Sequence, residues 1–311
     1  MRAVKRSGSN VEVVDVSEPS GDGVLVKVTS ATICGSDVHM LEKGFGNAVL
    51  GHEFGGLLPD GTLVAIRPTG MCGSCAFCQK GREHLCGTAM QRFFGGALDG
   101  GFADRVVVDP NCVFPAEGIA PSAVSLVEPL AVAVHGYRRA APVPGETVAV
   151  VGAGSVGLVA AAVAVYHGFE CWIDARYPHQ QAAAEAIGAR VGIPDDRKFD
   201  VVFDAVGNQS AVTRSIAVCQ RGGRVIELGV FWDPITIGGE VTFREISLVP
   251  AVLYAHHHGD SDFQRAIEIL RSRPELERIL VTHRFALDDA GEAFRVATDR
   301  SAGSIKVGFR F

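Results

Sequence analysis

The stretch Val148-Ala-Val-Val-Gly152-Ala-Gly154-Ser-Val-Gly157-Leu-Val-Ala160 decides the fold of this chain. A β-branched run leads into a glycine-rich turn, which opens an alanine-rich segment typical of a helix. The glycines permit a tight turn and the close approach of a pyrophosphate, whose charge meets free N–H groups at the helix N-terminus. They could serve packing alone, but a strand before the turn and a helix after it form the context that predicts dinucleotide binding. The residues expected at this site are Gly152, Gly154, Ser155, Val156 and Gly157.

Strand-like and helix-like segments alternate on the C-terminal side of this turn, which indicates βαβ units and a parallel sheet. These segments are Cys171–Asp174, Pro178–Gly188, Asp200–Val206, Ala211–Cys219, Gly223–Leu228 and Asp262–Ser272. On its N-terminal side we expect a helix from about Ala123 to Ala140, with Ser122 as its cap. Residues 123–272 are therefore predicted to form a Rossmann nucleotide-binding domain.

Residues 1–122 have a different character, rich in Gly, Pro and Val. Short alternating runs such as Val11–Val16 and Gly23–Thr29 are typical of antiparallel strands. The tail holds one more expected helix, about 287–298, and a last strand from Ile305. The predicted fold is α/β: a doubly wound parallel sheet, plus a β-rich domain formed by residues 1–122 and completed by 273–311.

Composition excludes several classes of protein. The chain has 311 residues, of which 47% are hydrophobic and 21% charged, so two domains with sizeable cores are expected. The net charge is −6 and no basic block stands out, which argues against a nucleic-acid or membrane-surface partner. No apolar run approaches the roughly 20 residues that cross a bilayer, and the N-terminus shows no signal-peptide pattern. We expect a cytoplasmic protein.

Four cysteines follow one another closely in a C-x2-C-x2-C-x7-C run: Cys72, Cys75, Cys78 and Cys86. Disulfides are one interpretation, but in a reducing compartment this spacing favours metal ligands. Four thiolates enclose a tetrahedral zinc and leave no open position, which is the mark of a structural site. Cys112, Cys171 and Cys219 stand singly in apolar surroundings and are expected to be core thiols.

A second set of residues has the composition of a catalytic zinc site. It comprises Cys34, Ser36, Asp37 and His39 in one motif, His52 and Glu53 in a Gly-His-Glu motif, and Glu128 in a Glu-Pro-Leu-Ala-Val-Ala-Val-His run. One thiolate, one imidazole and one carboxylate leave a fourth position for substrate or water. Each motif is weak alone, but together with the four-cysteine run they predict a second zinc.

These motifs, together with the Thr282–Ala290 segment, resemble the zinc-dependent medium-chain dehydrogenase/reductase family, in its alcohol, sorbitol and threonine dehydrogenase group. The resemblance covers nearly the whole chain. It implies that the β-rich domain is GroES-like and that the active site lies in a cleft between the domains. Cys34 and His52 would bind the catalytic zinc, with Glu53 or Glu128 as the carboxylate ligand. Asp37 would support these ligands.

The activity implied by the resemblance is hydride transfer between a secondary alcohol or polyol, or its ketone, and NAD(P). Zinc would lower the pKa of the alcohol, Ser36 would accept the proton and His39 would pass it on. The alternative is a catalytically inactive NADP-binding structural or regulatory protein, which would not need Cys34, His52 and Ser36. A zinc-free quinone or enone reductase is a third interpretation, but it predicts neither metal motif.

The choice between NAD and NADP depends on the end of the second strand of the nucleotide domain. An acid there would accept from the ribose 2′-OH of NAD, whereas an arginine could hold the 2′-phosphate of NADP. Asp174 and Arg176 are both near, and Ala175 falls where an NAD-selecting acid would sit. NADP is therefore slightly favoured.

Further features concern the β-rich domain, the substrate pocket and the assembly. The stretch after Glu53 is shorter than the family usually has, so the β-rich domain is expected to be trimmed there. His256, His257 and His258 have no family role and could face substrate or a subunit interface, or form a polar loop. Phe45, Phe93, Phe94 and the 230–258 region are candidates for lining the substrate pocket. The resemblance implies a homodimer or homotetramer, with 240–249 as the candidate edge strand.

Overall fold

The computed structural model describes residues 1–44, 48–257 and 259–311. Phe45 and His258 therefore lie outside the described residues. The chain separates into two compact units, of which the first comprises Met1–Glu128 with Ala255–Phe311 and the second Pro129–Tyr254. The sequence analysis had placed these boundaries at 122/123 and 272/273. Within the described ranges, no helix has both the length and the apolar character needed to span a bilayer.

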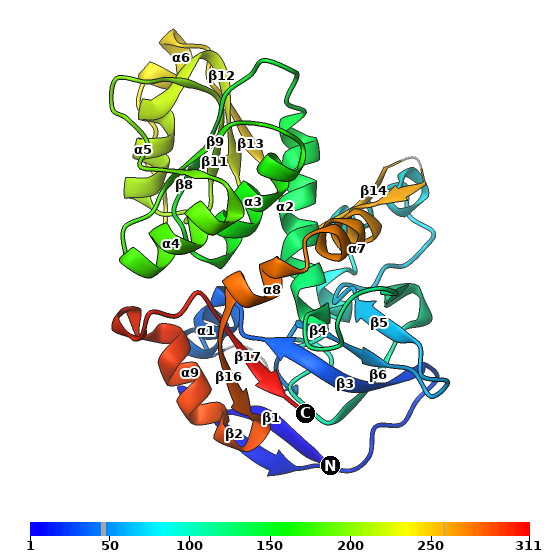
Figure 1. Ribbon diagram of the computed structural model, residues 1–311. Helices are drawn as coiled ribbons and strands as arrows, with labels where there is room; N and C mark the ends of the chain where they lie inside the picture. Colours follow the sequence, from blue (N-terminus) through cyan, green and yellow to red (C-terminus); the bar gives the residue numbers. More distant parts are fainter. Residues whose placement is uncertain (45–47, 258) are drawn as a thin grey trace. The chain divides into compact units, whose positions relative to one another are not determined.

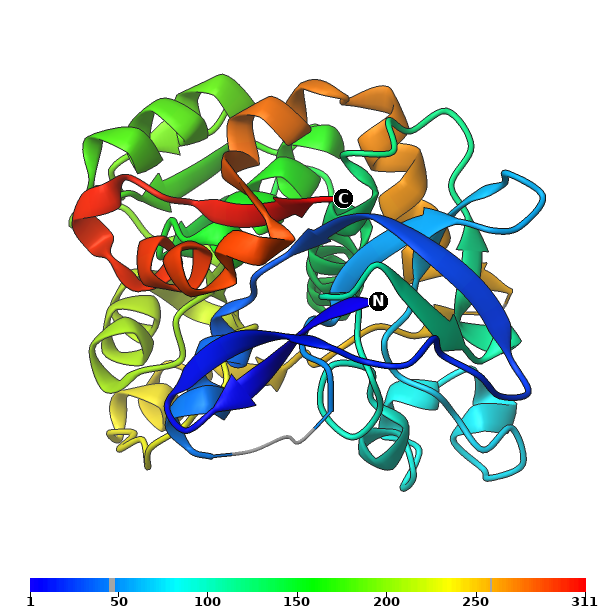
Figure 2. The ribbon, with the colours of Figure 1, turned by 90° about the horizontal axis from the view of Figure 1, so that it is seen from below.

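The first unit is built on a seven-stranded sheet in the order β16-β17-β3-β4-β5-β7, with β6 also paired to β3 (Figure 1). Its strands are β3 (Val24–Thr32), β4 (Glu53–Leu57), β5 (Leu63–Ile66), β6 (Arg105–Val108), β7 (Val113–Pro115), β16 (Val281–Ala286) and β17 (Lys306–Arg310). Only β16 and β17 pair in parallel. Figure 2 shows the C-terminal strand β17, in red, close to β3, so the tail completes a sheet begun near the N-terminus.

Smaller elements surround this sheet. Two hairpins contribute β1 (Arg2–Ser7) with β2 (Asn10–Asp15), and β14 (His256–His257) with β15 (Asp260–Ser261). The helices of the unit are α1 (Gly35–Glu42), α7 (Asp262–Ser272), α8 (Glu275–Leu280) and α9 (Ala290–Thr298). Short 3-10 turns include η1 (Cys78–Lys80), η2 (Glu83–Leu85) and η5 (Val124–Leu126).

The pairing of β3 with β4 brings two motifs together. The strands are antiparallel and Thr32 pairs with Glu53, so the end of β3 meets the start of β4. Cys34 follows β3, and His52 precedes Glu53. The close approach of the strands requires glycine at position 56, because a Cβ there would lie 2.0 Å from the carbonyl oxygen of Lys27. The core beneath contains Phe54, Phe102 and Phe309 in full burial.

The short stretch after Glu53 forms a hairpin. Leu57 of β4 pairs with Leu63 of β5, and the Leu58 N–H donates to the Thr62 carbonyl at 2.9 Å. Five residues, 58–62, connect the two strands. The chain thus passes from β4 directly into β5 through one short loop.

The second unit has the predicted Rossmann topology. Its six strands are all parallel, in the order β10-β9-β8-β11-β12-β13. They are β8 (Val148–Val151), β9 (Cys171–Asp174), β10 (Arg190–Val191), β11 (Phe199–Asp204), β12 (Cys219–Glu227) and β13 (Ser247–Pro250). The helices are α2 (Val127–Ala140), which enters from the first unit, α3 (Ser155–Tyr166), α4 (Pro178–Ile187), α5 (Gln209–Val218) and α6 (Glu240–Phe243). Figure 1 shows α3 and α5 on opposite sides of the sheet.

Three local expectations differ from the structure. Ser122 does not begin a helix, because the 3-10 turn η5 comes first and α2 starts at Val127. Glu240–Phe243 is helical, and only Ser247–Pro250 forms a strand, which lies at the sheet edge. The helix α7 was expected in the nucleotide domain but belongs to the first unit, where the Phe263 and Phe114 rings lie 5.1 Å apart.

Candidate functional site

Cys34, His52 and Glu53 converge in the first unit. Their possible ligand atoms all lie within 4.8 Å of one another. Cys34 precedes α1, and its N–H donates to Asp37 Oδ2 at 2.9 Å. The other oxygen of Asp37 accepts from His52 Nδ1 at 2.8 Å. A single buried carboxylate therefore positions two of the three residues, and it leaves Nε2 of His52 directed away from the Asp37 bond and available to a metal.

The electrostatics of this cluster suit a cation. Burial lowers the pKa of His52, but the negative groups of Asp37 and Cys34 outweigh it, and the pKa ends well above the ordinary value. The two groups that attract a proton to this imidazole would equally attract a metal ion. Sulfur, imidazole nitrogen and carboxylate oxygen are the usual ligands of zinc. The donor set and its spacing therefore fit a zinc ion with an open position.

Ser36, His39 and Phe93 differ in their distance from the cluster. Ser36 Oγ lies 3.2 Å from His52 Nε2. The Phe93 ring, which is buried, lies 5.3 Å from the His52 ring and forms an apolar wall beside it. His39 is on the exposed side of α1, with Nδ1 3.3 Å from Glu42 Oε2. A hydroxyl thus adjoins the cluster, and a solvent-facing imidazole lies one helical turn further on.

Glu53 is held by a residue that the sequence analysis missed. Lys306 Nζ, fully buried on β17, donates to both Glu53 oxygens at 2.7 and 2.5 Å, and Thr32 Oγ1 donates at 2.5 Å. Burial lowers the pKa of Lys306, but the charges of Glu53, Cys34 and Glu128 reverse this and raise it. The available signal was a lysine at the start of the final strand, directly before the apolar residues Val307, Gly308 and Phe309.

Glu128 has a different environment from Glu53. It is buried in the first turn of α2 and contributes to the electrostatic surroundings of Lys306. Among the described residues, the compact group of ligand atoms contains Glu53 and not Glu128. A carboxylate has about four lone-pair sites, so Glu53 can accept from Lys306 and Thr32 and still face a metal.

The four cysteines 72, 75, 78 and 86 form a second cluster, again within 4.8 Å of one another. The Cys78 sulfur lies 3.9 Å from that of Cys72 and 3.5 Å from that of Cys75. A tetrahedral zinc with Zn–S bonds of about 2.3 Å separates its sulfurs by about 3.8 Å, so the spacing fits. The Ser74 and Cys75 backbone N–H groups lower the pKa of Cys72 to about 6, which favours the thiolate. All eight cysteines are free thiols.

The glycine-rich turn of the second unit follows the Rossmann pattern glycine by glycine. Gly152 has a φ of 94° and its added Cβ would lie 2.3 Å from Val206 Cγ2. At Gly157 a Cβ would lie 1.8 Å from the Gly152 carbonyl oxygen, so this glycine permits helix and turn to pack. Gly154, in contrast, faces open space. The first and third glycines shape the turn and the second leaves room for a ligand, as a pyrophosphate requires.

Asp174 and Arg176 have separated roles in the structure. The Asp174 oxygens accept from the Ile193 N–H at 3.1 Å and from Arg214 Nε at 3.1 Å. Arg176 is exposed at the turn into α4. Its backbone N–H donates to Gln180 Oε1 at 3.2 Å, which fixes the turn. The acid is thus engaged within the domain, whereas the arginine faces solvent.

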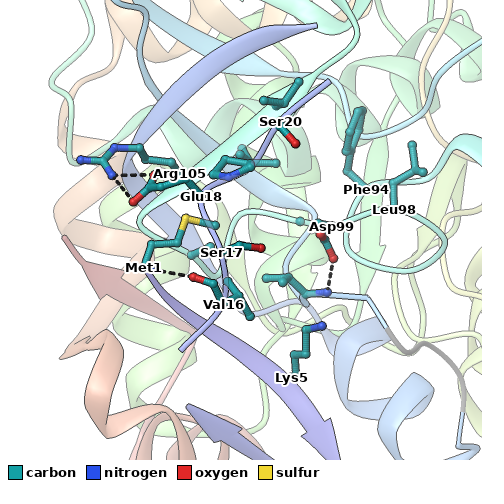
Figure 3. A pocket seen from close by; sticks show the side chains of 16 residues that line it. Met1, Lys5, Val16, Ser17, Glu18, Ser20, Phe94, Leu98, Asp99 and Arg105 are labelled. Carbon is teal, nitrogen blue, oxygen red and sulfur yellow. Dashed lines mark hydrogen bonds and ion pairs between the residues drawn. The ribbon is translucent and has the colours of Figure 1, made fainter. Parts of the chain in front are cut away.

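A separate cavity of about 570 Å³ lies in the first unit (Figure 3). Its lining includes Lys5, Glu18, Phe94, Asp99 and Arg105, and none of the predicted metal ligands or catalytic residues is among its lining residues. Phe94 is also part of the buried core. The expectation that Phe94 faces the same site as Phe93 is therefore not supported by its surroundings.

Comparisons with known proteins agree with this architecture. Residues 20–118 match the alcohol dehydrogenase GroES-like domain family, and residues 155–272 match the zinc-binding dehydrogenase family. The chain is 30% identical over 320 residues to L-idonate 5-dehydrogenase (NAD(P)(+)) of Escherichia coli (strain K12), covering 91% of this chain and 90% of that protein. It is 29% identical over 317 residues to L-galactonate-5-dehydrogenase of the same organism, covering 90% and 89%.

A solved structure is similar over its full length. A candidate zinc-binding dehydrogenase from Sinorhizobium meliloti 1021, crystallised with NADP, has 28% identity and a TM-score of 0.87, with 100% of this chain and 99% of that chain covered. The fold, the metal motifs and the family matches define a zinc-dependent oxidoreductase of the alcohol and polyol dehydrogenase class. The chain belongs to the zinc-dependent medium-chain dehydrogenase/reductase family.

Proposed function

We propose that this protein transfers hydride between a secondary hydroxyl of a polyol or sugar acid, or the corresponding ketone, and NADP. The open three-residue cluster of Cys34, His52 and Glu53 is the observation that carries this proposal. Relatives named for L-idonate and L-galactonate support a polyhydroxylated substrate. The intact cluster leaves nothing in favour of an inactive protein.

In this proposal Cys34, His52 and Glu53 bind the catalytic zinc, and Glu128 is a nearby acid that does not bind it directly. When bound, zinc supplies Lewis-acid chemistry that makes the substrate hydroxyl more acidic. Ser36, whose Oγ adjoins His52 Nε2 at 3.2 Å, relays the hydroxyl proton: Oγ accepts it while the Ser36 hydroxyl releases its own proton. His39, exposed on the same helix, takes up the released proton and passes it to solvent. Asp37 holds Cys34 and His52 in place throughout.

The other cysteine cluster is proposed to bind a structural zinc. Its four thiolates leave no position for substrate, so it contributes no chemistry. For the cofactor, the exposed Arg176 and the absence of an acid at Ala175 support the 2′-phosphate of NADP, which would meet the guanidinium. Gly154, Ser155 and Val156 are proposed to bind the pyrophosphate at the N-terminus of α3.

The experiment is a metal and activity analysis of wild type, Cys34→Ser and Cys75→Ser. We expect two zinc equivalents per wild-type chain and one in each variant, with oxidation of a polyol and sugar-acid panel by NADP lost only in Cys34→Ser. A single zinc held by the four-cysteine cluster, or no oxidation of any panel member at full zinc loading, would refute the proposal.

Comparing Glu53→Gln with Glu128→Gln identifies the carboxylate ligand, because only Glu53→Gln should weaken zinc binding strongly.

We also propose a homo-oligomer in the cytoplasm. The edge strand β13 pairs only with β12 among the described strands, and Phe243 on the adjacent α6 is 85% exposed. Such an edge and side chain can pair with a second copy. Light scattering of wild type and Phe243→Asp tests this, and the variant is expected to shift toward the monomer.

The proposed location in the cytoplasm is supported by the eight free thiols, which are typical of a reducing compartment.

A further inference from the structure

Arg214, in the middle of α5, organises one corner of the nucleotide domain. Its Nε donates to Asp174 Oδ2 at 3.1 Å, one terminal nitrogen to Asp195 Oδ1 at 2.6 Å, and the other to the Ile193 carbonyl at 2.8 Å. The Ile193 N–H closes the network by donating to Asp174 Oδ1 at 3.1 Å. One guanidinium therefore ties the end of β9 to the turn that follows β10.

This network uses both oxygens of Asp174. Asp174 is the last residue of β9 and the only acid between that strand and α4, since Ala175, Arg176 and Tyr177 follow it. In Rossmann domains an acid about 20 residues after the glycine turn accepts from the ribose 2′-OH. Asp174, the acid near this position, is instead bonded to Arg214 and to the backbone N–H of Ile193.

We propose that Arg214 is a positioning residue for cofactor choice: by holding Asp174 against α5 and the Ile193 backbone, it keeps the carboxylate away from the adenosine ribose and leaves that position to Arg176. The inference rests on the proposed function and deepens it, because it explains how a chain with an acid at the end of β9 accepts a 2′-phosphate. A free Asp174 carboxylate would accept from a 2′-OH and repel a 2′-phosphate.

The turn that carries Arg176 does not depend on Arg214. Gln180 Oε1 accepts from the Arg176 N–H at 3.2 Å, and Gln181 Nε2 donates to the Ala175 carbonyl at 3.1 Å. Both glutamines belong to α4, whereas Arg214 belongs to α5. Loss of Arg214 should therefore release Asp174 and leave the proposed phosphate contact in place. This separation makes the proposal testable by the ratio of two affinities.

The experiment measures dissociation constants of NADPH and NADH by fluorescence titration in the absence of substrate, with 2′,5′-ADP as a competing probe. In Arg214→Met the preference for NADPH over NADH should fall by roughly tenfold. The released Asp174 carboxylate would repel the 2′-phosphate of NADPH, and it would accept a hydrogen bond from the 2′-OH of NADH. Adding Asp174→Asn should restore the preference, since the carboxylate is gone. Arg197→Met is the matched control: Arg197 pairs with Glu170 at 2.9 Å on the same domain and should leave the ratio unchanged.

Asp174→Asn alone provides a second test that keeps Arg214 and its remaining bonds. It should change the ratio by less than about twofold, because the carboxylate is already withdrawn from the ribose. A strong, selective loss of NADH binding in this variant would overturn the inference. So would an Arg214→Met protein that loses both cofactors equally, or a double variant that fails to recover. A wild-type protein that binds neither dinucleotide would refute the proposed function itself.

Discussion

Asp37 and Lys306 are buried charged residues, and each is paired with a member of the metal cluster. Asp37 bonds to Cys34 and His52, and Lys306 bonds to Glu53. An ion is costly to bury without a partner. The bonds to Cys34, His52 and Glu53 therefore fix the positions of Asp37 and Lys306, and the same bonds fix the three cluster residues. At the scale of single residues, the geometry of the cluster is therefore set by hydrogen bonds from Asp37 and Lys306, which are not themselves members of the cluster.

Lys306→Met should destabilise the zinc-free protein by about 3 to 5 kcal/mol, because the Glu53 carboxylate then remains buried without a counter-ion. Adding Glu53→Gln should recover most of this loss. Urea unfolding of zinc-free protein measures both effects. Lys27→Met, at an exposed position on β3, is the control and should change stability little. Equal stabilities of Lys306→Met and wild type would show that the ion pair contributes nothing net.

At the scale of elements, two adjacent strands of the nucleotide domain end in buried acids. Asp204 closes β11, Glu227 closes β12, and the two are paired in register. Among the described atoms, neither oxygen of Glu227 has a hydrogen-bond partner. Burial, followed by the Asp204 charge, raises the pKa of Glu227 to about 8. Glu227 is therefore protonated in the folded protein at neutral pH.

This pair predicts a pH dependence of stability. Glu227 has an ordinary pKa of 4.5 when unfolded and about 8 when folded, so the folded state retains its proton longer. Below pH 4.5 Glu227 is protonated in both states and does not change the free energy of unfolding. Between pH 4.5 and about 8 only the unfolded state loses the proton, so stability falls as pH rises. Glu227→Leu should raise the melting temperature at about pH 8 and much less at about pH 5. Glu185→Gln, an exposed acid on α4, is the control. A gain independent of pH would contradict the assignment.

The β14 strand is joined to the four-cysteine lobe through His256. Its N–H donates to the Gly81 carbonyl at 2.9 Å, and Nδ1 lies 2.6 Å from Glu83 Oε1. Glu83 is buried, and although burial raises its pKa, the bond to His256 contributes to lowering it to about 2. The first of the three consecutive histidines therefore has a structural contact in the same unit.

His256→Ala should weaken the link between β14 and the four-cysteine lobe, at a cost of about 1 to 3 kcal/mol, because the buried Glu83 then loses the imidazole and keeps only the backbone N–H of residue 256 at 3.3 Å. Hydrogen exchange followed by mass spectrometry should show faster exchange in residues 81–86 and 255–262, with other strands unchanged. His283→Ala on β16 serves as the reference variant. If exchange accelerates across the whole first unit instead, the contact is part of the global fold and not a local tie.

At the scale of the whole molecule, the two metal clusters are proposed to have different roles: the four-cysteine cluster stabilises the fold, and the cluster of Cys34, His52 and Glu53 carries the chemistry. Cys75→Ser removes one ligand of the closed cluster and should lower the melting temperature, because zinc binding in such small lobes is coupled to their folding. Turnover per folded, zinc-loaded active site should stay within about twofold of wild type if the lobe only stabilises. Differential scanning calorimetry with active-site titration measures both. Cys171→Ser, a buried single thiol, is the control. Loss of turnover at an unchanged melting temperature would reverse the assignment.

Much of this architecture was predictable because its signals are local. Two motifs can each be recognised within one short segment: the strand, glycine turn and helix at 148–166, and the four cysteines within 72–86. The alternation of strands and helices predicted the parallel sheet, and the structure has it. The spacing of a motif limits which backbone conformation and which ligand it can serve, so such segments can be interpreted without knowing their neighbours.

Pairing between distant segments was decided only by the tertiary structure. Lys306 reaches Glu53 across 253 residues, Arg214 reaches Asp174 across 40, and the Glu83 carboxylate contacts His256 across 173. No local pattern selects one lysine or arginine among the 29 in the chain as the partner of a given acid. Strand order and packing make that selection, because only they determine which side chains are buried together and must neutralise one another.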